Sequence, residues 1–240
     1  MKNQFEAFLD DLKTAHGKNL ASVIFYGSAA AGDFMPEPAD YRLLVALRRI
    51  TPEDLRRSNA VMREWTRLGF HVPVYFTVDE IRTASDVFPI EFHNMERSRL
   101  VLFGEDVLAD LEISDRFLRH QTEYELRSKL IRLRRAYIPA SASVEGLTRL
   151  MAESLASFAS LFRAVLRLKG VEPPVQKHRV VALTAQELGL DGKPFEKIFN
   201  IREDNFAEKL DEVSANELFA GYLEQIEAVI AAVDELDKKS

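Results

Sequence analysis

Two apolar runs near the N-terminus constrain the fold of this chain more than any other feature. The first run covers residues 22–26, and Gly27 and Ser28 follow it directly. The second run covers residues 40–47 and begins with Asp40 before it becomes apolar. Short runs of this kind, bounded by turn residues, predict β-strands. We therefore expect two strands of one sheet, with a sharp turn at the end of the first strand.

Helix and strand signals continue to about residue 113. Apolar residues at helical spacing predict a first helix over residues 3–15. Thr51 followed by Pro52 predicts a helix that continues to about Leu68, because a hydroxyl residue is a good N-cap and proline fits the first turn. A capping box at Thr77 predicts a short helix. Further short strands are expected over residues 71–77, 88–92 and 100–103.

Beyond residue 113 the strand-like runs end and long helical patterns follow. Ser114 is the expected N-cap of a helix that continues to about Tyr137, and a capping box at Ser214 predicts the last helix. Apolar stripes over residues 147–165 and 218–236 are expected in a helical core, and a dimer surface is the second interpretation. We expect two domains, over residues 1–113 and 114–240.

Composition narrows the classes of function. The 240 residues carry a formal net charge of −6, so overall charge gives no argument for nucleic-acid binding. The chain has no cysteine, which excludes disulfides, thiolate metal sites and thiol nucleophiles. No apolar run has the length of a membrane helix, and no signal peptide is recognisable. A cytoplasmic location without membrane contact is therefore expected.

The order of the strand, the Gly-Ser turn and the acidic start of the second strand resembles the DNA polymerase β type nucleotidyltransferase superfamily. The resemblance implies an α+β fold, with a small mixed sheet and helices followed by an all-helical bundle. It also implies transfer of a nucleoside monophosphate from a nucleoside triphosphate to an acceptor, which the sequence does not identify. In this family Gly27 and Ser28 would contact the nucleotide phosphates, and Asp40 would be a catalytic residue that binds magnesium.

One departure from the family pattern is Arg42, which stands where the second acid of an Asp-x-Asp pair is expected. Alternate residues of a strand face the same side, so Asp40 and Arg42 share a face. Arginine is permanently cationic, and beside Asp40 it would form an ion pair and repel a divalent metal ion. A second departure is Tyr75, which stands where a neighbouring strand is expected to supply a third carboxylate. Magnesium binding is therefore expected to be impaired.

Glu91 is the acid nearest to these strands that has apolar neighbours in a strand-like run. Two roles are open for it, a buried partner of Arg42 and a substitute catalytic carboxylate. Three hypotheses follow. The first is a pseudoenzyme that binds a nucleotide at Gly27, Ser28 and Arg42 with weak or no transfer. The second is an active nucleotidyltransferase that uses Asp40 and Glu91, and the third is a non-catalytic interaction or homodimerisation module.

Basic residues gather on the expected helix after residue 114, at Arg116, Arg119, Arg127, Lys129, Arg132, Arg134 and Arg135. We interpret them as a solvated helix face, because Glu123 and Glu125 lie among them. Contacts with phosphates or RNA are the alternative. The expected partners are therefore a nucleotide and an acceptor, with a homodimer left open and nucleic acid not expected.

Overall fold

The computed structural model describes residues 2–27, 29–30, 41–202 and 210–236. The chain divides into two compact units, Met1–Asp115 and Arg116–Ser240, which are treated separately below. Within the described residues, no helix combines the length and the hydropathy needed to span a membrane.

The first unit is built on a four-stranded mixed sheet with the strand order β3-β2-β1-β4. The strands are β1 (Leu20–Tyr26), β2 (Arg42–Leu47), β3 (Val74–Thr77) and β4 (Arg99–Gly104). Strand β1 is antiparallel to both β2 and β4, whereas β2 and β3 are parallel. The small mixed sheet expected from the sequence is confirmed.

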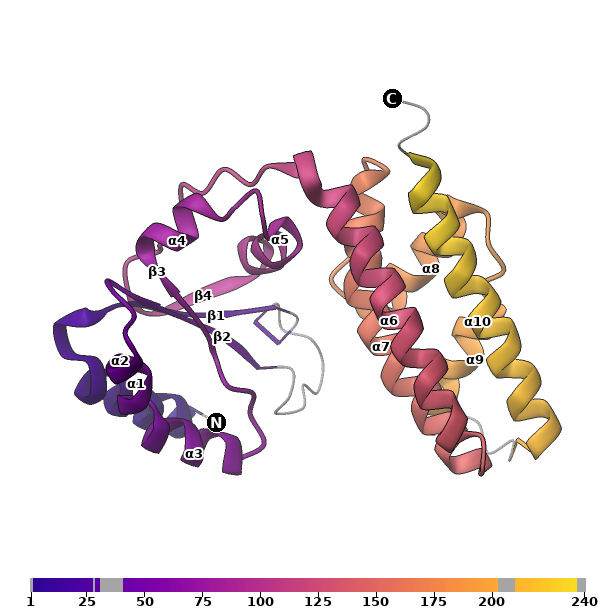
Figure 1. Cartoon of the computed structure of the whole chain (residues 1–240), viewed down its shortest axis with the longest axis horizontal. Helices are drawn as coiled ribbons and strands as arrows, with labels where there is room; N and C mark the ends of the chain where they lie inside the picture. The colour runs from indigo at the N-terminus through magenta and orange to yellow at the C-terminus, as the bar shows by residue number, and fades with distance from the viewer. Residues whose placement is uncertain (1, 28, 31–40, 203–209, 237–240) are drawn as a thin grey trace. The chain divides into compact units, whose positions relative to one another are not determined.

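Helices cover both faces of this sheet (Figure 1). The helices of one face are α1 (Lys2–His16), α2 (Pro52–Arg57) and α3 (Asn59–Arg67), and those of the other are α4 (Val78–Thr83) and α5 (Pro89–Arg97). Successive residues of β1 alternate between the two cores, so that Phe25 packs with Trp65 on one face and Tyr26 packs with Phe92 on the other. From Val23 to Tyr26, each β1 side chain therefore has a defined face.

The prediction of a strand over residues 88–92 is wrong, because these residues begin helix α5. Pro89 stands in the first turn of this helix, where its fixed φ favours a helical start. Phe92 and Met95, one helical turn apart, are buried against the sheet. The helix expected from Thr51 is present, but it is broken at Ser58 into α2 and α3.

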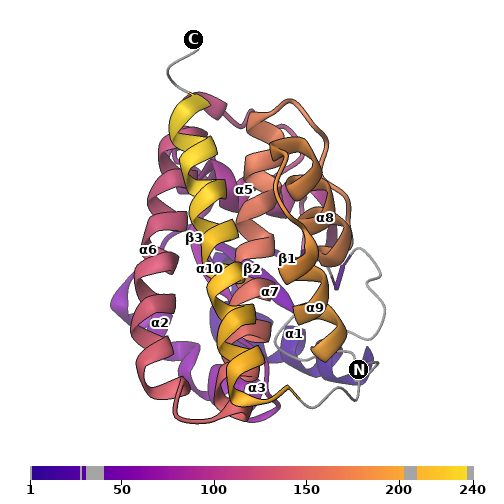
Figure 2. The ribbon, with the colours of Figure 1, turned by 90° about the vertical axis from the view of Figure 1, so that its right-hand side faces the viewer.

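The second unit is a helical bundle. Its helices are α6 (Leu118–Ala140), α7 (Val144–Leu168), α8 (Lys177–Leu188), α9 (Lys193–Arg202) and α10 (Glu212–Glu235). Figure 2 shows α6, α7 and α10 lying side by side, and the apolar stripes of α7 and α10 supply buried side chains such as Phe162 and Tyr222.

Two predicted caps are wrong in this unit. Ser114 does not cap α6, because a 3-10 turn (Asp115–Phe117) comes first and Phe117 is the N-cap residue. Ser214 does not open α10, because Asp211 accepts a hydrogen bond from the amide of Ser214 and acts as the N-cap. Helix α9 was not expected from the sequence.

Candidate functional site

The candidate site lies at the end of β1, where Gly27 follows the last strand residue. Gly27 has a φ of +90°, a left-handed conformation that residues with a Cβ atom rarely adopt. Its amide donates a hydrogen bond to the carbonyl oxygen of Ser98 at 3.0 Å, which fixes the turn against the start of β4. The expected glycine turn is therefore present. Ser28, which was expected to contact phosphates, lies outside the described residues.

Arg42 begins β2 directly opposite Tyr26. A Cβ atom added to Gly27 would lie 3.9 Å from Cδ of Arg42, so the arginine side chain passes alongside the turn. The side chain is exposed and, within the described chain, makes no ion pair or hydrogen bond. No ion pair between Arg42 and Glu91, one of the two roles open for that acid, is present among the described contacts.

Two charged residues, Arg42 and Glu91, act on the hydroxyl group of Tyr26. Its side chain is 5% exposed. Burial raises the pKa of the Tyr26 hydroxyl, Arg42 opposes this rise, and Glu91 adds to it. Both charged groups therefore act electrostatically on one hydroxyl at this end of the sheet. Sequence reasoning missed Tyr26, because its position opposite Arg42 depends on strand pairing that the sequence does not specify.

Glu91 differs from its expected setting. It lies in the first turn of α5, a helix that packs against β1, and its side chain is exposed. Glu91 is therefore not a buried carboxylate within a strand. The helical position still leaves Glu91 on the side of the sheet that carries Tyr26, because α5 contributes Phe92 to the core of that side.

Tyr75 lies on the opposite face of the sheet from Arg42. It pairs with Val45 and packs with the core beneath α1 and α3, where its hydroxyl donates a hydrogen bond to Oγ of Ser58 at 3.0 Å. Burial raises the pKa of the Tyr75 hydroxyl, and the bond to Ser58 opposes the rise. The expectation that Tyr75 replaces a metal ligand is therefore wrong.

The β3 residues on the Arg42 side are Val74 and Phe76, since these pair with Leu44 and Ala46. Neither is a carboxylate. Among the described residues no group of three or more metal-ligating side chains could hold a metal ion. Asp40, the metal-binding residue that the resemblance implies, lies outside the described residues.

The basic helix predicted after residue 114 is α6, and several of its arginines are bound to acids of the same unit. Glu123 pairs with both Arg119, at 3.0 Å, and Arg127, at 2.7 Å. Arg134 reaches Glu227 of α10 at 2.7 Å. Arg127 and Arg134 are exposed, whereas Arg119 and Glu123 are largely buried, so only part of the predicted basic face is open to solvent.

Comparison with solved structures identifies the architecture. The chain is similar to spectinomycin adenyltransferase AAD(9) from Enterococcus faecialis, in a crystal structure with ATP and spectinomycin. The two are 12% identical, the similarity covers 99% of each chain, and the TM-score is 0.61. No protein-family model and no curated protein matches the sequence. The chain therefore shares the overall fold of this adenyltransferase.

Proposed function

We propose that this protein binds a nucleoside triphosphate at the Gly27 end of β1, and that Arg42 contacts the phosphates. Transfer of the nucleoside monophosphate is slow or absent. The observation that carries the proposal is the exposed guanidinium group of Arg42, which lies beside the Gly27 turn and is not engaged by the described chain.

Phosphate binding at this place has a simple physical basis. Backbone amides at a turn after a strand form a concave site for anions. A guanidinium group presents a planar set of N–H donors that matches two phosphate oxygens at once. Arg42 would supply part of the positive charge that a divalent ion supplies elsewhere, so nucleotide binding should not require magnesium.

Slow transfer follows from the side chains that share this face. Two-metal transfer needs carboxylates that clamp both ions. The described strand residues at this end of the face are Tyr26, Arg42, Val74 and Arg99, and none of them is an acid. An arginine at a ligand position also repels a divalent cation.

The comparison supports the choice of ligand. AAD(9) was crystallised with ATP and spectinomycin, and the similarity extends over both units of the present chain. We infer that ATP is a suitable nucleotide to test and that any acceptor is a small molecule.

An active nucleotidyltransferase is the alternative, and the position of Glu91 favours it. Glu91 and Arg42 both influence Tyr26, so an acid is present near this end of the sheet. In this alternative Asp40 and Glu91 would carry the reaction, and magnesium would be required. The two proposals differ in the metal dependence of ATP binding.

Calorimetric titration of ATP into the full chain, with EDTA or with magnesium, tests the proposal. We expect similar affinity in both buffers, and Arg42→Ala should weaken binding by about tenfold or more. Arg63→Ala, which removes an exposed arginine from α3, is the matched control and should bind like the parent chain. Binding that occurs only with magnesium would favour the active enzyme. No binding in either buffer would favour the non-catalytic interaction module.

A further inference from the structure

The first unit contains a cavity of about 690 Å³ at the end of the sheet opposite Gly27. Its walls come from Leu20 at the start of β1, Arg48 after β2, Val78 at the start of α4 and the segment that follows β4. Along β1, the distance from Leu20 at the cavity to Gly27 is roughly 20 Å, at about 3.3 Å per residue. Leu20 at the cavity and the Gly27 turn therefore lie at opposite ends of β1.

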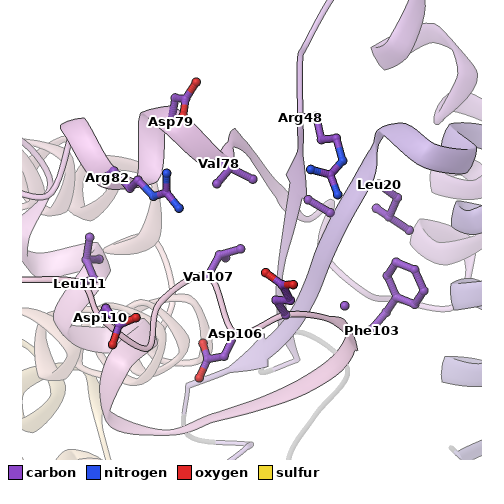
Figure 3. Close-up of a pocket in the computed structure, with 13 residues that line it drawn as sticks. Leu20, Arg48, Val78, Asp79, Arg82, Phe103, Asp106, Val107, Asp110 and Leu111 are labelled. Atoms are coloured by element: carbon purple, nitrogen blue, oxygen red, sulfur yellow. The ribbon is translucent and has the colours of Figure 1, made fainter.

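Charges of both signs surround this cavity. Figure 3 shows Arg48 and Arg82 reaching toward the cavity from two sides. Three carboxylates that line it belong to Asp79, Glu105 and Asp110. A fourth carboxylate, that of Asp106, already has partners within the fold. It forms an ion pair with Arg99 at 2.9 Å and accepts a hydrogen bond from the amide of Leu108 at 3.1 Å.

These opposite charges remain separate from one another. In the described part of the chain, Arg48, Arg82, Asp79, Glu105 and Asp110 form no ion pair, although they line one cavity. Arg48 donates only its Nε hydrogen, to the carbonyl oxygen of Lys18 at 3.2 Å. A ligand that carries both charges could contact the two groups without first breaking an ion pair.

Apolar side chains form the rest of the lining. Val78 and Val107 lie between the two arginines in Figure 3, and Leu20, Phe103 and Leu111 add further apolar surface. The volume is within the range of small-molecule sites, and more of the lining surface is polar than apolar. A complementary ligand is small and has one anionic group, one cationic group and an apolar body.

We propose that this cavity binds an α-amino acid with an apolar side chain. Arg48 or Arg82 contacts its carboxylate, Glu105 or Asp110 contacts its ammonium group, and Val78 and Val107 contact its side chain. Because the site contacts both charges, it should bind an amino acid more tightly than a simple amine or a simple carboxylate.

Calorimetry on the full chain tests the ligand class with matched compounds. L-Phenylalanine and L-leucine are the zwitterionic probes, 2-phenylethylamine lacks the carboxylate, and 3-phenylpropionate lacks the ammonium group. We expect at least one zwitterion to bind, and both single-charge analogues to bind about tenfold more weakly or not at all. Equal binding of either analogue, or no binding of either amino acid, would overturn the proposal.

Paired variants test the two charged groups of the cavity. Arg48→Ala with Arg82→Ala, and separately Glu105→Gln with Asp110→Asn, should each weaken amino-acid binding by about tenfold or more. Arg63→Ala and Glu112→Gln remove exposed charges outside the cavity and should leave it unchanged. All variants should bind ATP like the parent chain. A failure of the amino-acid proposal can therefore be told apart from a failure of the proposed nucleotide site. Unchanged amino-acid binding in both paired variants would place the ligand elsewhere.

Discussion

Arg42 lies directly opposite Tyr26 where β1 and β2 meet, and its side chain passes alongside the Gly27 turn. Tyr26 is buried, so Arg42 has a rigid neighbour on one side and solvent on the other. This relationship places an exposed cation at the end of the sheet where we propose that the nucleotide binds.

Gly27→Ala should weaken ATP binding as well as stability. The φ of +90° costs a residue with a Cβ atom about 1–3 kcal/mol, and the turn would relax away from the phosphate position. The control is Gly189→Ala, because Gly189 has a φ of +65° at the end of α8. Urea unfolding should show destabilisation in both variants, whereas calorimetry should show lost ATP affinity in Gly27→Ala alone. Equal ATP affinity in the two variants would contradict a role for the turn.

Tyr75→Phe should reduce stability and leave ATP binding unchanged. The substitution removes the hydrogen bond to Ser58, whose loss should cost about 1 kcal/mol in the free energy of unfolding. ATP affinity should be unaffected because Tyr75 faces away from Arg42. A clear change in ATP affinity would instead put Tyr75 at the nucleotide site.

Gly104→Ala should be among the most destabilising single substitutions in the first unit. A Cβ atom there would lie 2.0 Å from the carbonyl oxygen of Ala21, so β1 and β4 would have to separate. Gly170→Ala separates this clash from backbone strain, because Gly170 has a φ of +72° and no atom near the added carbon. Chemical denaturation should show that Gly104→Ala loses about 3 kcal/mol or more and Gly170→Ala about 1 kcal/mol. Similar losses in both would mean that the sheet accommodates the added carbon.

The free energy of unfolding should fall as the pH drops below 6.5. His16 is buried, and burial lowers the pKa of its imidazole from 6.5, with Asp54 opposing this shift and Arg57 adding to it. The unfolded chain therefore takes up a proton at a pH where the folded chain does not, which favours unfolding in acid. Other titrating groups add their own dependence, so variants are needed to isolate His16.

Urea unfolding between pH 7.5 and 5.5 isolates this contribution. His16→Asn should show a smaller decrease in stability with acid than the parent chain. His71→Asn, which alters an exposed histidine, should keep the parent's pH dependence. If His16→Asn retains the full pH dependence, the buried imidazole is not its source.

Strand positions near the turn could be predicted from the sequence, because the apolar runs there have clear limits. The face of the sheet on which Tyr75 lies could not be predicted, because a shift of one residue in strand pairing moves every side chain to the opposite face. The pairing of Val74 with Leu44 decides that Val74, and not Tyr75, lies on the Arg42 side.

Short apolar runs caused the other errors. Residues 88–92 are compatible with a strand or a buried helix, and Pro89 was the signal that favoured a helix start. Similarly, Asp211 and Ser214 are both acceptable N-caps, and the local sequence does not choose between them. The roles of Tyr26 and Arg42 depend on strand pairing, which only the fold establishes.

The most direct test of the account is titration of ATP in EDTA into the parent chain and the Arg42→Asp variant. Replacing the cation by a carboxylate should abolish metal-free binding, because the phosphates would then meet a like charge. We expect measurable affinity for the parent chain and none for the variant. Equal affinity in EDTA would contradict the claim that Arg42 binds the phosphates.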